Sequence, residues 1–295
     1  MAASTRVVIT GVRGQLGAEL MRTEWPGGFD VIGVDRQAVD LSQPDSVAAK
    51  IAALRPSIIV NCAAYTQVDQ AEIDEELASI VNATAVSELA RVADELDALL
   101  IQISTDYVFD GAKDGWYVES DPTGPTGAYG RTKLAGEAAA LRAKRAVVLR
   151  TAWVYGGLGS NFVGTMLRVA ALRDELGVVD DQLGCPTATA DITAAVLAVA
   201  ASPERATQRV YHVASPQSAS WYDFAVAILA EPIAAGAVRV KRLTTAEYPT
   251  KARRPANSRL DSSAFARDFG LTLPDWDVSM PPVRAELLAR ASSTQ

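Results

Sequence analysis

The clearest indication of the fold of this chain is the stretch Arg6-Val7-Val8-Ile9-Thr10-Gly11-Val12-Arg13-Gly14-Gln15-Leu16-Gly17. Its first five residues are mostly apolar and β-branched, as in a buried parallel strand, and its glycines lead into a helical pattern over 18–23. Glycines at such a point allow a tight turn and let the backbone approach a pyrophosphate, to which the helix N-terminus offers free N–H groups. A strand, a glycine turn and a helix in this order predict a dinucleotide-binding unit.

The next expected strand, Val31-Ile32-Gly33-Val34, ends at an acidic side chain, Asp35. A carboxylate at this point can accept a hydrogen bond from the adenosine ribose, which favours NADH. Arg36 follows directly and could instead pair with the 2′-phosphate of NADPH, so both cofactors remain open. Asp40 and Leu41 come next, where Asp40 could face the cofactor or cap the loop.

Strands and helices alternate along much of the remaining chain. Further strands are expected over 58–61, 99–103, 146–149 and 210–213, with helices over 45–54 and 75–96. This alternation predicts an α/β fold with a doubly wound parallel sheet of Rossmann type and right-handed connections. Ligands bind at the carboxyl edge of such a sheet, where Cys62-Ala63-Ala64-Tyr65 and Ser104-Thr105-Asp106-Tyr107 end two strands. The hydroxyl groups there could bind a carbonyl oxygen or cap the strand.

Composition limits the classes of protein. The chain has 295 residues, of which 49% are hydrophobic and 21% charged, as is typical of a soluble globular protein. A net charge of −7 argues against nucleic-acid partners, and no apolar run approaches the ~18 residues of a membrane span. No signal peptide is visible, and the two cysteines, Cys62 and Cys185, suit a reducing cytoplasm. The single histidine, His212, is expected to be structural.

Tyr129 and Lys133 lie four residues apart in a helical segment, so that their side chains share one face. A phenol with a pKa near ~10 is a poor acid at neutral pH, and a neighbouring ammonium is expected to lower that pKa. The pair therefore indicates acid–base chemistry, the alternative being a solvated helix surface.

Three arginines and two tryptophans are candidates for substrate contacts. Arg253, Arg254 and Arg259 lie in a proline-flanked segment, where guanidinium groups would suit a diphosphate or form a solvated basic loop. Trp153 could stack on a ring or pack in the core. Trp221, in Trp221-Tyr222-Asp223, is expected to anchor a helix start rather than touch substrate.

Four motifs together resemble the extended short-chain dehydrogenase/reductase superfamily: Gly11-x-x-Gly14-x-x-Gly17, Asn61-Cys62-Ala63-Ala64, Ser104-Thr105-Asp106 and Tyr129-x-x-x-Lys133. Within it, the chain resembles the dTDP-4-dehydrorhamnose reductase family over nearly its whole length. Three clusters carry that narrower likeness: Asp181-Gln182-Leu183-Gly184 with Pro186-Thr187, Trp221-Tyr222-Asp223, and the segment from Tyr248 to Asp261.

The resemblance implies hydride transfer from NADPH or NADH to the carbon-4 ketone of a dTDP-linked 4-keto-6-deoxysugar. Tyr129 would donate the proton, with Lys133 as its electrostatic partner, Thr105 as the hydroxyl residue and Asn82 as the asparagine that holds a water and the lysine. The implied cofactor contacts are Gly11, Gly14, Gln15, Leu16, Gly17, Asp35, Arg36, Asp40, Leu41, Ala63, Ala64, Tyr65, Tyr129 and Lys133. The implied substrate contacts are Thr105, Asp106, Tyr107, Trp153, Arg253, Arg254 and Asn257.

The expected organisation is a cofactor domain over 1–154, to which 188–213 return, and a smaller, partly discontinuous substrate domain over 155–187 and 214–295. Some family members bind Mg²⁺ through carboxylates at a dimer contact, and a homodimer is therefore possible here. Glu19 and Glu286 match two such acids, but Ala190 stands where a third is expected and Asp191 is one position late. The sequence thus argues against Mg²⁺ and leaves the question open.

Two alternatives compete with this reading. A sister reductase could act on another dTDP-4-keto sugar, as in the dihydrostreptose branch of antibiotic synthesis. A non-catalytic regulatory subunit could keep the reductase fold to bind an enzyme, as the methionine adenosyltransferase β subunit resembles this family. The presence of Thr105, Tyr129 and Lys133 argues against the second alternative.

Overall fold

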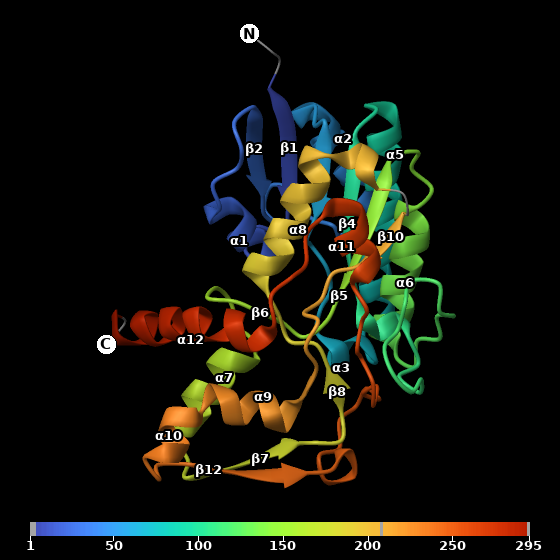
Figure 1. The fold of residues 1–295 in the computed structure, drawn as a ribbon. Helices are drawn as coiled ribbons and strands as arrows, with labels where there is room; N and C mark the ends of the chain where they lie inside the picture. Colours follow the sequence, from blue (N-terminus) through green and yellow to red (C-terminus); the bar gives the residue numbers. More distant parts are fainter. Residues whose placement is uncertain (1–3, 207–208, 294–295) are drawn as a thin grey trace.

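A six-stranded parallel sheet forms the centre of the computed structural model, which describes residues 4–206 and 209–293 (Figure 1). The strand order is β10-β5-β4-β3-β1-β2. The strands are β1 (Thr5–Thr10), β2 (Phe29–Val34), β3 (Ile58–Asn61), β4 (Leu99–Thr105), β5 (Ala146–Thr151) and β10 (Val210–His212). The chain places β2 on one side of β1 and β3 on the other, which opens a crevice at the carboxyl ends of these strands. The expected doubly wound fold is confirmed.

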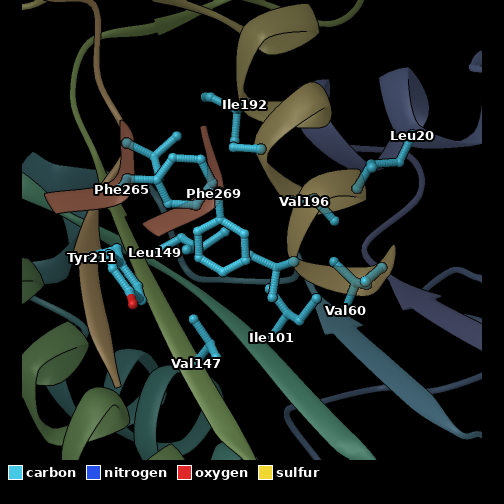
Figure 2. Packing of buried hydrophobic residues seen from close by; sticks show 14 of the residues in the cluster. Leu20, Val60, Ile101, Val147, Leu149, Ile192, Val196, Tyr211, Phe265 and Phe269 are labelled. Carbon is cyan, nitrogen blue, oxygen red and sulfur yellow. The ribbon is translucent and has the colours of Figure 1, made fainter. Parts of the chain in front are cut away.

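Helices cover both faces of the sheet. Because side chains alternate along a strand, Val7 and Ile9 of β1 join one apolar cluster and Val8 joins the other. The first cluster is completed by α1 (Gln15–Arg22), α8 (Thr189–Ala201) and α11 (Ser263–Phe269), whose Phe265 and Phe269 pack toward the sheet in Figure 2. The second is completed by α2 (Pro44–Leu54), α5 (Ala85–Glu95) and α6 (Ala128–Ala140).

The helix expected over 75–96 is present, with a π-helical turn inside it that was not predicted. The segment consists of α4 (Glu75–Ser79), a π-helical turn η1 (Ile80–Thr84) and α5. Hydrophobic periodicity does not reveal one extra residue in a turn, and such π turns are frequent at functional sites. The turn carries Asn82, one of the expected site residues.

A smaller lobe lies beyond the carboxyl edge of the sheet (Figure 1). Its elements are β6 (Val154–Tyr155), α7 (Phe162–Ala170), β7 (Glu175–Val179), β8 (Leu183–Gly184), β9 (Thr187–Ala188), β11 (Ala219–Ser220), α9 (Trp221–Ile228), α10 (Ala230–Ala234), β12 (Arg239–Leu243) and α12 (Trp276–Ser293). Tyr155, Phe224, Ile228 and Trp276 belong to its own apolar core. Between these segments the chain returns to the main body, where α8 packs on α1 and β10 pairs with β5.

Short elements complete the fold: α3 (Val68–Ala71) and the 3₁₀ turns η2 (Asp106–Val108), η3 (Pro203–Arg205) and η4 (Thr245–Glu247). His212 is fully buried in β10, and burial lowers the pKa of its imidazole to about 3, so the ring is neutral. This supports its structural role. Within 4–206 and 209–293, none of the helices combines the length and apolarity that crossing a membrane requires.

Candidate active site

A cleft of about 1050 Å³ opens at the carboxyl edge of the sheet. The loops that follow β1, β2, β3, β4 and β5 all contribute to it. The predicted residues that line it are Gly11, Gly14, Gln15, Leu16, Gly17, Arg36, Asp40, Leu41, Ala63, Ala64, Tyr65, Thr105, Asp106, Tyr107, Tyr129, Lys133 and Trp153. Side chains that lie far apart in the sequence therefore meet in one cavity.

The glycine turn has the geometry that a pyrophosphate requires. Gly11 has a φ of +70°, and a Cβ on it would lie 2.7 Å from the backbone nitrogen of Ala63. A Cβ on Gly17 would lie 2.8 Å from Cα of Val12, so the helix packs directly on the turn. Helix α1 begins after Gly14 without a side-chain cap, which leaves its first N–H groups free for an anion.

Two ion pairs border the end of the cleft next to β2. Asp35 is held by Arg13 at 2.7 Å and by the N–H groups of Gln37 and Ala38 at 3.0 and 3.2 Å. The Arg13 guanidinium lowers the pKa of Asp35 below its usual range. The predicted ribose acceptor is thus occupied and does not line the cleft, whereas Arg13 does. Arg13 was not predicted as a site residue, although its position inside the glycine turn could have indicated that it borders the cleft.

The second pair joins Arg36 to Asp40 at 3.3 Å. The Arg36 side chain is 77% exposed, so its guanidinium is available to a ligand. Asp40 also accepts hydrogen bonds from the backbone N–H and the hydroxyl of Ser42, at 2.9 and 2.7 Å. Asp40 therefore both caps its loop and borders the cleft.

Tyr129 and Lys133 project from the first two turns of α6. Lys133 is buried, and its ammonium donates a 2.6 Å hydrogen bond to the carbonyl oxygen of Ile103. Burial lowers the pKa of Lys133 to about 8, an effect that the negative charge of Glu137 partly offsets. The pKa of Tyr129 is raised by burial, while a hydrogen bond with Thr105 opposes the rise.

The expected lowering of the phenol's pKa by Lys133 is therefore not what the structure shows. Desolvation of the phenol outweighs its hydrogen bond with Thr105, so Tyr129 is a neutral phenol at neutral pH. A neutral phenol is the form that can donate a proton. Sequence spacing could not reveal this, because the burial of both groups depends on the surrounding loops.

Asn82 connects the loop after β3 to the helix that carries Tyr129. Its side-chain oxygen accepts from the N–H of Tyr65 at 2.8 Å, and its amide nitrogen donates to the carbonyl of Tyr65 at 3.2 Å. The same nitrogen donates to the Thr132 hydroxyl at 3.0 Å. Asn82 thus fixes the residue next to Lys133.

Asp106 and Tyr107 surround the phenol of Tyr129. Thr105 donates a 2.8 Å hydrogen bond to the Asp106 carboxyl, and burial raises the pKa of that carboxyl to about 6. The ring of Tyr107 meets the ring of Tyr129 edge to face at 5.4 Å between centroids. The hydrogen-bonding side chains of Thr105 and Asp106 therefore lie beside the phenol of Tyr129.

Two tryptophans border the same cleft. Trp153 and Trp221 stack with their ring centroids 3.5 Å apart and their planes at 6°. Trp221 begins α9, where Ser220 and Asp223 form a reciprocal capping box, so the expected helix start is confirmed. Trp221 was not predicted as a site residue, because the strand pairing that brings it there is long-range.

Arg253 and Arg254 line a second hollow of about 580 Å³ together with Asp110, Asp181 and Tyr248. Arg254 donates a 2.6 Å hydrogen bond to Asp69 of α3, and the same carboxylate accepts the N–H of Ala252 at 2.9 Å.

Asn257 lines neither hollow. Its amide nitrogen donates to the carbonyls of Lys113 and Gly115 at 2.6 and 2.7 Å, and its oxygen accepts from Arg259 at 2.9 Å. The structure therefore gives the Asn257 side chain a role in joining two loops.

The residues at the position of the Mg²⁺ ligands implied for some family members do not fit a metal ion. The Arg22 guanidinium lies between the carboxylates of Glu19 and Glu286, with contacts of 2.7 and 2.5 Å. Glu19 also accepts from the Thr189 hydroxyl at 3.0 Å. Among the residues that the structure describes, His, Cys, Asp and Glu form no group of three that could hold a metal. A cationic side chain therefore stands where a divalent cation would need oxygen ligands.

Comparison with known proteins gives consistent similarities. The RmlD substrate binding domain family matches residues 5–288. The dTDP-4-dehydrorhamnose reductase of Escherichia coli (strain K12) is 42% identical over 294 residues, covering 95% of this chain and 97% of the relative. The crystal structure of a Clostridium acetobutylicum dTDP-4-dehydrorhamnose reductase superposes with a TM-score of 0.90 at 36% identity, covering 96% and 99%. The Bacillus anthracis dTDP-4-dehydrorhamnose reductase in complex with NADP gives 0.89 at 35% identity, with the same coverage.

Proposed function

Because this chain belongs to the RmlD substrate binding domain family, we propose that it is an NAD(P)H-dependent dTDP-4-dehydrorhamnose reductase. The proposed reaction reduces the carbon-4 ketone of dTDP-4-dehydro-L-rhamnose and yields dTDP-L-rhamnose. One observation carries this proposal beyond the likeness: Thr105, Tyr129 and Lys133 border the same cleft as the uncapped glycine turn.

The cleft fits a nicotinamide dinucleotide. The free N–H groups at the start of α1 would bind the pyrophosphate, and the small residues Ala63 and Ala64 leave room for a flat ring. Arg13 and Arg36 border the cleft with side chains that are 76% and 77% exposed, which supports acceptance of a 2′-phosphate. NADPH or NADH would supply the hydride, and the protein supplies position and charge.

Tyr129 is the proposed proton donor. As hydride reaches carbon 4, negative charge grows on the ketone oxygen, and a proton passes from the Tyr129 hydroxyl to that oxygen. The hydrogen bond with Thr105 favours the resulting phenolate, and Lys133, four residues further along α6, is its proposed electrostatic partner. Two hydrogen bonds hold the helix that carries Tyr129 in place. Lys133 donates to the carbonyl of Ile103, and Asn82 donates to the hydroxyl of Thr132.

The smaller lobe is the proposed substrate-binding region. We assign 1–154 and 188–213 to cofactor binding and 155–187 and 214–295 to the sugar nucleotide. Arg253 and Arg254 line a hollow of their own on this side, where two guanidinium groups suit a diphosphate. Asp106 and Trp153, at the carboxyl ends of adjacent strands, would contact the sugar.

The proposal is tested by mixing the purified protein with NADPH or NADH and dTDP-4-dehydro-L-rhamnose. We expect the absorbance of the reduced cofactor to fall and dTDP-L-rhamnose to form, identified by NMR. Faster turnover of a different dTDP-4-keto sugar would assign the chain to a sister reductase. Binding of both ligands without oxidation of the cofactor would indicate a non-catalytic protein.

A further inference from the structure

Trp153 has an uncommon backbone conformation beside the reacting groups. Its φ is +47°, in the left-handed region that bulky side chains rarely adopt. Strand β5 ends at Thr151, which pairs with Thr105 at the end of β4. Trp153 comes two residues after Thr151 and therefore lies close to the expected hydroxyl residue of the site. Strained residues persist only where their surroundings hold them, and they concentrate at functional sites.

Both faces of the Trp153 indole are covered by protein. Trp221 stacks on one face, with centroids 3.5 Å apart and planes at 6°. A Cβ on Gly184 would lie closest to Cε2 of Trp153, and 2.5 and 2.6 Å from Nε1 and Cζ2. An approach within the ring plane would reach Nε1 and Cζ2 before Cε2, so Gly184 lies over a face. Because Trp221 already fills the space along one face, Gly184 must cover the other.

The two residues that enclose Trp153 are joined to each other. Gly184 of β8 pairs with Ala219 of β11, an antiparallel ladder, and β11 leads directly into Trp221. Ser220 accepts from the N–H of Asp223 at 3.0 Å and donates to Asp180 at 2.7 Å. The β8–β11 ladder therefore fixes the spacing between Gly184 and Trp221 and forms a clamp around the indole.

We propose that Trp221 is a positioning residue that, with Gly184, holds Trp153 with its edge toward the sugar nucleotide. This inference rests on the proposed function and refines it. A sugar or base cannot stack on an indole whose two faces are covered, so contact with substrate is made by the rim of Trp153. The clamp belongs to the smaller lobe, and its loss should therefore weaken sugar-nucleotide binding and spare the cofactor.

The test compares Trp221→Ala, Trp221→Phe and Gly184→Ala with the wild-type protein. Affinity for dTDP-L-rhamnose is measured by calorimetry, which does not depend on turnover, and KM is measured for NADPH and for the keto sugar. The exciton couplet of two stacked indoles in circular dichroism reports the stack itself. Trp25→Phe is the matched control, because Trp25 packs on Phe29 beside the outer strand β2.

We expect Trp221→Ala to lose the couplet and to weaken binding of dTDP-L-rhamnose about fivefold, with the KM for NADPH changed less than twofold. Trp221→Phe should restore most of the affinity, since it restores a ring against Trp153. Gly184→Ala, which pushes the indole from the other face, should reproduce the loss. Trp25→Phe should keep both the couplet and the affinity.

Loss of the couplet in Trp221→Ala with unchanged affinity for dTDP-L-rhamnose would overturn the clamp and leave the proposed function intact. A rise in the KM for NADPH as large as the loss of affinity for dTDP-L-rhamnose would also overturn the clamp, because the effect would then be a general loss of structure. A wild-type protein that neither binds dTDP-L-rhamnose nor oxidises NADPH with the keto sugar would overturn both.

Discussion

The carbonyl oxygen of Asn82 stands where a Cβ on Gly136 would be, so the π turn and the helix that carries Tyr129 are in direct backbone contact. The absence of a side chain at Gly136 leaves room for this carbonyl. The contact complements the hydrogen bond from Asn82 to Thr132 and fixes α6 against the loop that follows β3.

Gly136→Ala should therefore displace the helix of Tyr129. The obstacle is backbone rather than a flexible side chain, so we expect a loss of about 1–3 kcal/mol in the free energy of unfolding. A fall in kcat should accompany it. Gly27→Ala is the matched control, since its Cβ would meet open space and should change stability little. Urea unfolding measures the free energy of unfolding, and steady-state kinetics measure kcat. A Gly136→Ala protein with the wild-type value of both would contradict the role of this contact.

The pKa of Lys133 near 8 predicts opposite effects of pH on activity and on stability. Activity, measured as kcat/KM for the cofactor, should fall as pH rises through about 8, because the free enzyme then loses the ammonium. Between pH 8 and 10.5 the unfolded chain keeps this proton and the folded chain does not, so stability should rise with pH, by up to about 3 kcal/mol. Lys133→Met should remove the pH dependence of kcat/KM and that of the stability. A variant whose pH profiles match those of the wild type would show that Lys133 is not the titrating group.

Arg254→Ala should raise the KM for the sugar nucleotide by about tenfold or more, because a charged hydrogen bond to phosphate would be lost. The KM for NADPH should not change. Lys251→Ala, an exposed cation on the same loop, is the control and should behave as the wild type. Initial rates at varied substrate concentration decide this, and an unchanged KM in Arg254→Ala would remove the arginine from the binding site.

Arg22 should make a metal ion unnecessary for joining α1 to α12. Neither EDTA nor Mg²⁺ should shift the Tm of the wild-type protein. Arg22→Met leaves the buried Glu19 without its cation, so we expect the free energy of unfolding to fall by about 1–2 kcal/mol. Arg91→Met removes only exposed ion pairs and should lower the free energy of unfolding by less than Arg22→Met does. Melting curves with and without chelator test this, and a fall in Tm caused by EDTA would contradict it.

The sheet and its carboxyl edge could be predicted from the sequence because buried parallel strands carry a strong local signal. β3 has the predicted bounds, and β1, β2, β4 and β5 extend one or two residues further than expected. The glycine turn was recognisable for the same reason, since strand, turn and helix are consecutive. The π turn around Asn82 was not predicted, because the apolar positions before and after it both fit the pattern of a single α-helix over 75–96.

Other features depend on contacts that no local pattern encodes. Arg13 engages Asp35 from a different loop, so the carboxylate that the sequence offered to the ribose is already paired. Trp221 reaches Trp153 through the β8–β11 ladder, whose strands have only two residues each. The pKa of Tyr129 rises because loops distant in the sequence bury it, which reverses the direction expected from its spacing to Lys133.

The rate of single-turnover hydride transfer in Tyr129→Phe is the sharpest test of Tyr129 as the proton donor. Protein with bound NADPH is mixed rapidly with dTDP-4-dehydro-L-rhamnose, and oxidation of the cofactor is followed in the variant and in the wild type. Loss of the proton donor should slow transfer by roughly 10²- to 10⁴-fold, while the Kd for NADPH stays within about twofold. Transfer by Tyr129→Phe at the wild-type rate would contradict the role of this phenol.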